Sequence, residues 1–263
     1  MAVYTHGQHE AVTNSYSWRS VANSASYLAP HLQPGLAVLD VGCGPGSITR
    51  DLAERVAPGV VTALDQSEEA LAKARATVGD LSTVVFTVGD VHALDFADDQ
   101  FDIVHAHQVL QHVADPVAAL REMRRVAKPG GIVAARDADY EAMTWFPASP
   151  GIADWLALYR AVARANGGQP DAGRQLKAWA RAAGFTDIIC SASTWTYATA
   201  AERRWWSTVW QDRLTVTAFA EQAQRDGYAT AGDIDRMLEG WRTWTADDDG
   251  WFVIVHGEIL CRA

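Results

Sequence analysis

Short apolar runs alternate with amphipathic segments through the first half of the chain. Five runs have the length and composition of buried β-strands: 36–41, 60–64, 83–88, 101–106 and 132–135. Three segments between them carry apolar residues at helical spacing: 47–57, 67–78 and 115–127. Because strands that are apolar on both faces need helices over both faces, the pattern predicts an α/β fold with a doubly wound, mostly parallel sheet.

Helix-capping residues mark where these helices begin. Ser67 precedes two glutamates, which suit the positive end of a helix dipole. Asp115 and Pro116 have the residue types of an N-cap and a first helical position. Ser47 is available as the N-cap of the first of the three helices.

The second half of the chain is less regular and rich in tryptophan. Ten of the 11 Trp follow residue 140. Helices are predicted at 152–166, 172–183, 200–225 and 232–244, and strands near 185–193 and at 251–261. The last strand is expected to lie antiparallel beside the fifth. The chain thus divides into an amino-terminal segment (1–30), an α/β core (31–140), a helical Trp-rich insertion that includes the sixth strand (141–250), and a last core strand (251–263).

Composition and charge exclude some partners. Lys and Arg number 22 against 32 Asp and Glu, a net charge of −10, so no general attraction toward a phosphate backbone is expected and nucleic acid is disfavoured. Three scattered cysteines in no CxxC pattern indicate a reducing compartment. No apolar run has the length of a membrane span, and the first residues lack signal-peptide features. We therefore expect a cytoplasmic protein without a membrane partner.

A glycine-rich loop carries the main chemical signal. The segment VLDVGCGPG (38–46) leads from a strand through Gly42, Gly44 and Gly46 into a helix. Glycines there let the backbone turn sharply and approach a ligand closely. Asp65 ends the next strand about 20 residues later, the expected place for a carboxylate that holds the hydroxyls of an adenosine ribose. Loop, helix, strand and acid in this order predict a nucleoside-containing cofactor.

Charge decides between two cofactors that use this arrangement. A dinucleotide site favours G-x-G-x-x-G/A, whereas this loop reads G-x-G-x-G with Ser47 at the third position of that pattern. Asp40 just before the loop would repel a pyrophosphate but suits a ligand with a sulfonium and an ammonium group. The loop therefore favours S-adenosylmethionine over NAD.

Residues 36–135 resemble the core of class I S-adenosylmethionine-dependent methyltransferases, in particular the group with the ubiquinone and menaquinone methyltransferases. The matching stretches are VLDVGCGPG at 38–46, VTALDQS at 61–67, VGDVHALDF at 88–96 and FDIVHAHQVLQHVADPVAALREMRRVAKPGG at 101–131. The resemblance implies a seven-stranded sheet with an antiparallel last strand. It also implies S-adenosylmethionine as the methyl donor, S-adenosylhomocysteine as the product and no metal.

The same resemblance assigns a role to each matching position. The resemblance implies that Gly42, Gly44 and the backbone of Ala106 and His107 contact the methionine part, and that Asp40 orients it. It implies that Asp65 binds the ribose hydroxyls. It also implies that Gln66, Asp90 and Val91 contact the adenine. Asp90 can instead be an ordinary turn residue after the third strand. The acceptor-side segment has no matching motif.

Methyl transfer from a sulfonium is a direct displacement, so a base is needed only where the acceptor must lose a proton. His107, at the end of the fourth strand, is our first candidate for that base, and Asp137, after the fifth strand, is the second. His105 would point to the same face as His107. His112 is favoured as a packed helix residue.

The first 30 residues hold several aromatic and basic side chains: Tyr4, His6, His9, Tyr16, Trp18 and Arg19. They are expected either to close over the cofactor as a helical lid, with Arg19 on the methionine carboxylate, or to form a solvated helical tail. Metal binding by the H-x-x-H pair is disfavoured because no further ligand accompanies it.

The Trp-rich insertion is expected to form the acceptor wall, with at least half of its Trp in a core and one of Trp205 and Trp206 facing a cavity or a partner.

The predicted enzyme methylates a small apolar or aromatic molecule, at an O, N or C atom. The segment HAHQ after the fourth strand differs from the Asn/Asp-Pro-Pro-aromatic motif of enzymes that methylate the amino groups of adenine or glutamine, so those substrates are disfavoured. A nicotinamide-dependent oxidoreductase and a catalytically silent cofactor-binding protein are the alternatives, and a homodimer is possible.

Overall fold

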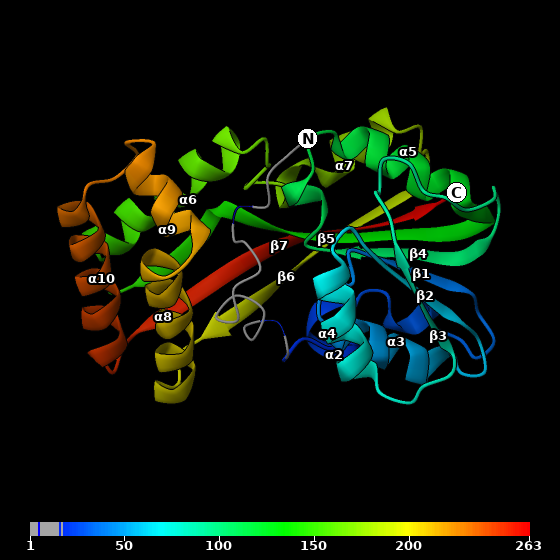
Figure 1. Cartoon of the computed structure of the whole chain (residues 1–263), viewed down its shortest axis with the longest axis horizontal. Coiled ribbons are helices and arrows are strands. Elements are labelled where there is room, and N and C mark those ends of the chain that lie inside the picture. The colour runs from blue at the N-terminus through cyan, green and yellow to red at the C-terminus, as the bar shows by residue number, and fades with distance from the viewer. Residues whose placement is uncertain (1–4, 6–15, 17) are drawn as a thin grey trace.

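Seven strands form a single sheet in the computed structural model, which describes Thr5, Tyr16 and residues 18–263 (Figure 1). The strands are β1 Val38–Val41, β2 Val61–Asp65, β3 Val84–Val88, β4 Phe101–His107, β5 Ala127–Phe146, β6 Ile188–Tyr197 and β7 Trp251–Arg262. Their order is β3-β2-β1-β4-β5-β7-β6. The first five pair in parallel, and β7 runs antiparallel to both β5 and β6. The predicted doubly wound sheet and its antiparallel last strand are confirmed.

Helices cover both faces of the parallel part of this sheet. They are α2 Val21–Ser24, α3 Ser47–Val56, α4 Glu68–Val78, α5 Pro116–Val126 and α7 Leu176–Ala182. In Figure 1, α2, α3 and α4 lie below the sheet, and α5 and α7 lie above it. Separate buried apolar clusters fill the two interfaces. None of the helices in the described part of the chain is long and apolar enough to cross a bilayer.

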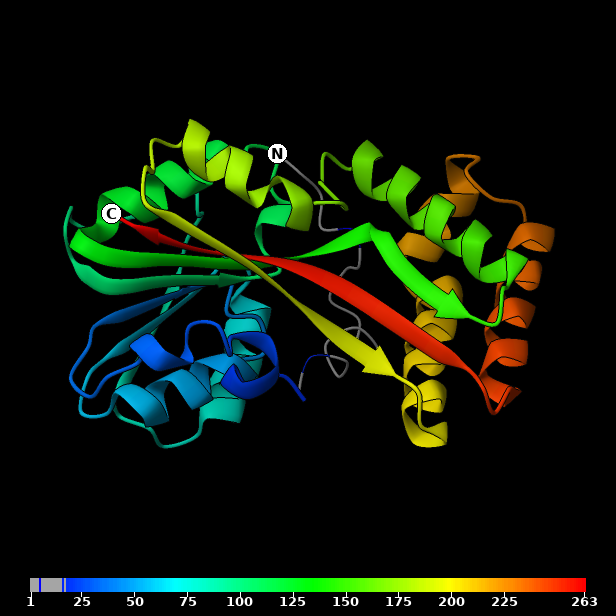
Figure 2. The same cartoon turned by 180° about the vertical axis from the view of Figure 1, so that it is seen from behind.

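The antiparallel strands extend beyond the parallel core and carry a second layer of helices (Figure 2). These helices are α6 Pro150–Ala165, α8 Ala200–Thr215, α9 Ala218–Arg225 and α10 Ala231–Ala246. They pack on the far halves of β5, β6 and β7, around a buried cluster of their own. The helical region is thus built on the same sheet as the α/β core.

Tryptophan dominates this second cluster. Trp155 lies with its ring centroid 4.3 Å from that of Trp210 and 4.9 Å from that of Trp241, and all three are fully buried. Six of the ten Trp that follow residue 140 are buried, as expected for a core: Trp155, Trp195, Trp206, Trp210, Trp241 and Trp244. The bulk of these rings holds the helical region to the sheet.

Local boundaries differ from the sequence pattern at a few positions. Asp115 and Ser67 cap α5 and α4 as predicted, each accepting from a backbone N–H. The N-cap prediction for Ser47 is wrong: Gly46 occupies that position with a φ of +80°, and the hydroxyl of Ser47 donates to the carbonyl of Tyr16 instead. The predicted helical region 200–225 consists of two helices. Thr217 stands at the N-cap position of α9, but its hydroxyl donates to the carbonyl of Arg213 and makes no capping hydrogen bond.

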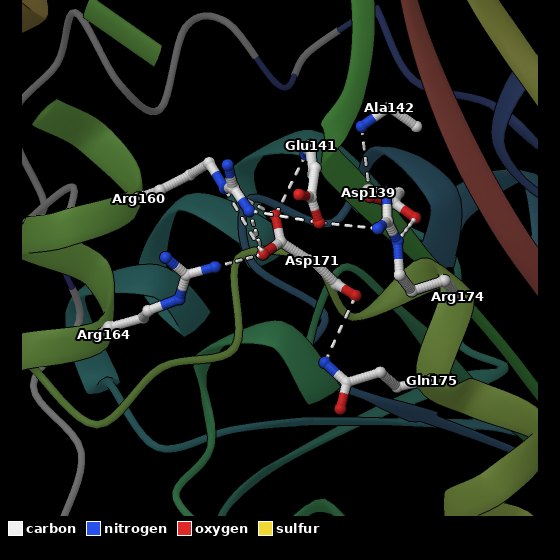
Figure 3. Close-up of polar contacts among 8 residues, drawn as sticks. All are labelled: Asp139, Glu141, Ala142, Arg160, Arg164, Asp171, Arg174 and Gln175. Carbon is white, nitrogen blue, oxygen red and sulfur yellow. Dashed lines mark hydrogen bonds and ion pairs between the residues drawn. The ribbon is translucent and has the colours of Figure 1, made fainter. Parts of the chain in front are cut away.

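A cluster of ion pairs holds β5 where its pairing with β7 shifts register between Asp139 and Thr144 (Figure 3). Asp171 accepts from Arg160 on α6 at 2.9 Å, and Arg174 donates to Asp139 at 2.6 Å. Arg174 belongs to the 3₁₀ helix η4 Gly173–Gln175. The cluster therefore ties three segments together at the place where the sheet leaves the parallel core.

Candidate active site

The glycine loop after β1 adopts a backbone that only glycine accepts without strain. Gly42 has a φ of +64°, and a Cβ there would lie 2.5 Å from a methyl carbon of Val109. Gly44 has a φ of +54° and faces open space, with nothing within 4 Å of the Cβ position. The loop can thus approach a ligand with its bare backbone at Gly44, while Gly42 is needed for packing.

A cavity of about 480 Å³ opens over this loop, at the carboxyl ends of β1, β2 and β4. The structure brings nearly all of the predicted cofactor residues to its wall: Arg19, Asp40, Gly42, Gly44, Asp65, Gln66, Asp90, Val91 and His107. Two predicted residues do not line it. Ala106 is buried within β4, and Asp137 is buried in β5.

Asp65 is held in one orientation by the backbone. Its Oδ2 accepts from the N–H of Gly44 at 3.0 Å, and its Oδ1 accepts from the N–H of Ser67 at 2.9 Å. Burial raises the pKa of Asp65, although these N–H donors oppose the shift. Each carboxylate oxygen keeps a further lone pair for a ligand, so Asp65 is oriented for a pair of neighbouring hydroxyls.

Asp40 lies deeper in the wall and has protein partners of its own. Its Oδ2 accepts from the hydroxyl of Thr49 at 2.6 Å, and its Oδ1 lies 2.9 Å from Nδ1 of His105. All three side chains are buried. Asp40 therefore contributes negative charge to the cavity from a rigid position.

Negative charge predominates around this first cavity. The described residues of its wall include four carboxylates against the cations Arg19 and Lys73: Asp40, Asp65, Asp90 and Asp115. Lys73 also pairs with Glu69 at 2.9 Å. Such a wall attracts a cationic ligand and disfavours a pyrophosphate.

Gln108 joins the amino-terminal segment to the sheet. Its Oε1 accepts from Nη2 of Arg19 at 2.7 Å, and its Nε2 lies 2.9 Å from Nε2 of His256 on β7. Its φ of +54° is unusual for a residue other than glycine. Gln108 could not be predicted from the sequence, because neither its backbone angle nor its partners 89 and 148 positions away leave a local signal.

His107 is a buried, neutral side chain beside the cavity. Burial lowers its pKa well below the usual value, and the charges of Arg19 and Arg136 add to the shift. Neither ring nitrogen has a hydrogen-bond partner among the described residues. Its ring centroid lies 5.7 Å from that of Trp195. A lone pair is thus available on this ring at neutral pH.

Asp137 supports the loop behind His107. Its Oδ1 accepts from the backbone N–H of Gln111 at 3.0 Å, within the 3₁₀ helix η3 Leu110–His112. Complete burial raises the pKa of Asp137 to about 7. The structure thus separates the two base candidates, with His107 at the cavity wall and Asp137 beneath it.

A second, smaller cavity of about 30 Å³ adjoins the first. The two share four wall residues: Tyr16, Arg19, Gln108 and His112. The rest of the second wall is mostly aromatic and comes mainly from β5, β6 and α8, and it includes Tyr140, Trp195, Tyr197, Trp205 and Trp206. The sequence predicts one of Trp205 and Trp206 at a cavity or a partner. Both reach the second cavity, since Trp206 stacks on Tyr197 while Trp205 lies half-buried beside them.

In the described part of the chain, no group of three His, Cys, Asp or Glu side chains is arranged to hold a metal ion. Tyr4, His6 and His9, the candidates for a lid or a metal site, lie outside the described residues.

Comparison with known proteins agrees with this geometry. Residues 32–202 match the family described as "Methyltransferase domain". An uncharacterized methyltransferase of Schizosaccharomyces pombe is 34% identical over 269 residues, which cover 98% of this chain and 96% of that protein. Demethylmenaquinone methyltransferase of Staphylococcus aureus is 36% identical over 129 residues, 49% of this chain and 51% of the relative. The solved structure of Haemonchus contortus phosphoethanolamine N-methyltransferase 2, in complex with phosphomonomethylethanolamine and S-adenosylhomocysteine, has a TM-score of 0.60 at 18% identity and covers 99% of this chain and 61% of its own.

Proposed function

The chain belongs to the S-adenosylmethionine-dependent methyltransferases, and from that premise we propose that it methylates a small apolar or aromatic acceptor. When bound, S-adenosylmethionine supplies a sulfonium whose methyl carbon is open to displacement. The observation that carries the proposal is the contact between two cavities of different character, one acidic and one aromatic.

The first cavity fits the donor. Its net negative wall suits a sulfonium and an ammonium group, and the bare backbone at Gly44 leaves room for close approach. Asp65 would take the ribose hydroxyls, since both its oxygens are already oriented by backbone donors. Gln66, Asp90 and Val91 would surround the adenine. Arg19 would meet the methionine carboxylate at the border of the two cavities.

The second cavity would take the acceptor. Trp18 packs edge-on against Trp195, with centroids 4.9 Å apart, and against Trp205 at 5.8 Å. The free space of about 30 Å³ is far smaller than that of the donor cavity, so we expect Trp18 to move aside when an acceptor ring binds. Trp18 lies in the segment before α2. Its side chain is 37% exposed, so it is less buried than Trp195 and Trp205.

His107 would act as the base where the acceptor must lose a proton. It lines the first cavity and packs against Trp195, which lines the second, so it lies near the line between donor and acceptor. Being neutral, it can accept a proton, but its lowered pKa makes it a weaker base than a free imidazole.

Calorimetric titration tests the donor assignment. S-adenosylhomocysteine should bind and NAD should bind weakly or not at all. Tighter binding of NAD would favour the oxidoreductase alternative. Transfer of a labelled methyl group to a panel of small aromatic molecules then separates an enzyme from a silent binding protein. His107→Gln should lower turnover with little change in S-adenosylhomocysteine affinity, whereas the exposed control Glu54→Gln should change neither.

The net charge of −10 and the three unpaired cysteines support a cytoplasmic protein that acts on small molecules rather than on nucleic acid.

A further inference from the structure

The side chain of Gln108 lies where the two cavities meet. It lines both the donor cavity and the aromatic second cavity, as do Tyr16, Arg19 and His112. Gln108 comes directly after β4, and its backbone N–H donates to the carbonyl of Arg136 on β5 at 2.7 Å. The sheet therefore fixes the backbone of Gln108, and the side chain extends from this fixed place to the border of the cavities.

Hydrogen-bond chemistry decides which way the amide of Gln108 is turned. The guanidinium of Arg19 has donors only, so the amide atom 2.7 Å from its Nη2 must be the oxygen Oε1. The amide nitrogen Nε2 then lies 2.9 Å from Nε2 of His256, and that ring nitrogen has to accept. The opposite orientation would set an NH2 group against the guanidinium, donor against donor.

The same contacts decide where His256 carries its proton. A neutral imidazole has one N–H and one lone pair, so a lone pair on Nε2 leaves the proton on Nδ1. His256 is fully buried, and burial lowers its pKa well below the usual value, with the charges of Arg136 and Arg19 adding to the shift. The ring is therefore neutral at physiological pH, as its contact with the amide requires.

Arg19 has further contacts at this border. Its guanidinium carbon lies 4.1 Å from the ring centroid of Tyr16 and 5.3 Å from that of Trp195. Trp18, the preceding residue, packs edge-on against the same ring of Trp195. The hydrogen bond from Arg19 to Gln108 thus joins Trp18 and Arg19 to the end of β4, although 89 positions of chain separate the two partners.

We propose that Gln108 is a positioning residue, which holds Arg19 where this side chain can meet the methionine carboxylate of the donor. This inference rests on the proposed function and adds the residue through which Arg19 is placed. A flexible arginine loses conformational entropy when a ligand orders it. A hydrogen bond that orders it beforehand therefore raises donor affinity, and His256 supports this bond by accepting from the other end of the same amide.

A double-mutant cycle on the full-length protein tests the proposal, with the affinity for S-adenosylhomocysteine measured by calorimetry. This probe keeps the carboxylate that Arg19 would meet. Gln108→Gly removes the side chain and suits the left-handed backbone at this position. It should weaken binding about 3- to 10-fold, the effect of one net hydrogen bond, and Arg19→Met should weaken binding at least as much. In the Arg19→Met background Gln108→Gly should have no further effect, because Gln108 acts through Arg19.

Asp99→Gly is the matched control. In the described part of the chain, Asp99 is the other residue besides glycine with a positive φ, +58°, and it is exposed and lines neither cavity. This variant makes the same backbone change away from the site and should bind S-adenosylhomocysteine as tightly as the parent protein. Thermal melts show whether each variant is folded at the temperature of the titration.

Nitrogen-15 NMR of histidine-labelled protein gives a second measurement, which a loss of stability alone would not move. In the parent protein His256 should carry its proton on Nδ1, and the signal that disappears in His256→Gln identifies it. Gln108→Glu replaces the amide donor by a second acceptor, so the proton of His256 should move to Nε2. This measurement keeps the proposal testable if Gln108→Gly is unstable.

The outcomes are distinct from those of the donor test. Three results would overturn the positioning role while S-adenosylhomocysteine still binds: additive effects of Gln108→Gly and Arg19→Met, unchanged affinity in a folded Gln108→Gly, or a proton on Nε2 of His256 in the parent protein. Failure of S-adenosylhomocysteine to bind the parent protein would overturn the proposed function itself, and this inference with it.

Discussion

Asp40 and His105 occupy paired positions on β1 and β4, and their side chains meet with Oδ1 of Asp40 2.9 Å from Nδ1 of His105. From the sequence alone, Asp40 is predicted as a donor-site residue and His105 as a neighbour of the base candidate His107, with no contact between the two. The pairing instead makes His105 a support for Asp40, together with the hydroxyl of Thr49. The negative charge at the end of β1 is therefore held in place from within the sheet.

Replacing Asp40 by Asn should harm both binding and folding. The amide loses the negative charge and offers an NH2 group where one carboxylate oxygen accepted, so Thr49 or His105 must change from donor to acceptor in a buried position. We expect the free energy of unfolding to fall by about 1–3 kcal/mol in urea melts. We also expect the affinity for S-adenosylhomocysteine to fall about tenfold or more. Thr49→Val removes one hydroxyl donor and should lower stability with a smaller effect on affinity; equal losses of affinity in both variants would contradict a direct charge effect of Asp40.

Asp65→Ala should weaken donor binding by roughly 10- to 150-fold, which corresponds to the loss of charge-assisted hydrogen bonds to two hydroxyls. The fold should survive, because the residue ends β2 at the cavity wall. Calorimetry with S-adenosylhomocysteine measures the change. Glu68→Ala is the matched control, since this carboxylate lies three residues on, is exposed and does not line the cavity. If Asp65→Ala binds as tightly as the parent, the ribose is held elsewhere.

The raised pKa of Asp137 should make the stability of the folded protein depend on pH. Burial raises its pKa to about 7 in the folded state, whereas an unfolded Asp has a pKa of about 3.9. Between these values the folded state keeps a proton that the unfolded state has lost, so this residue's contribution to stability is full at low pH and is lost as the pH rises toward 7. Asp137→Asn mimics the protonated form and does not titrate. Relative to it, the parent should lose about 2–3 kcal/mol of unfolding free energy between pH 5 and pH 8.

Urea melts of both proteins at the two pH values measure this difference. The exposed control Asp154→Asn should follow the parent at each pH. A constant gap between the parent and Asp137→Asn would mean that Asp137 is ionised throughout.

Two Trp→Ala variants separate the aromatic core from the acceptor wall. Trp241 is fully buried and lines neither cavity, so its truncation should lower the free energy of unfolding by about 3–5 kcal/mol. Trp205 is half-buried at the second cavity, so its truncation should raise the acceptor KM with a smaller loss of stability. Donor affinity should stay nearly unchanged in both. Unfolding of both variants to the same extent would place Trp205 in the core.

The parallel half of the fold could be predicted because its signals are local. Apolar runs, the caps Ser67 and Asp115, and the glycine loop each act within a few residues. The β5 strand could not be predicted at its full length of 20 residues. Its outer half, with Tyr140 and Trp145, is apolar enough for a strand but becomes one only because β7 pairs with it as far as Phe146.

By itself the sequence determined the order of strands and helices, the glycine turn at Gly42 and Gly44, and an acid at the end of β2. These follow from steric limits on the backbone and from the spacing of apolar side chains, and both depend only on residues that are close together in the chain. Only the tertiary structure decided that Gln108 joins Arg19 to His256, and that Arg213 and Tyr197 face the same aromatic space. Those contacts join residues far apart in the chain, and their geometry depends on how β5, β6 and β7 extend beyond the parallel core and carry the helical region.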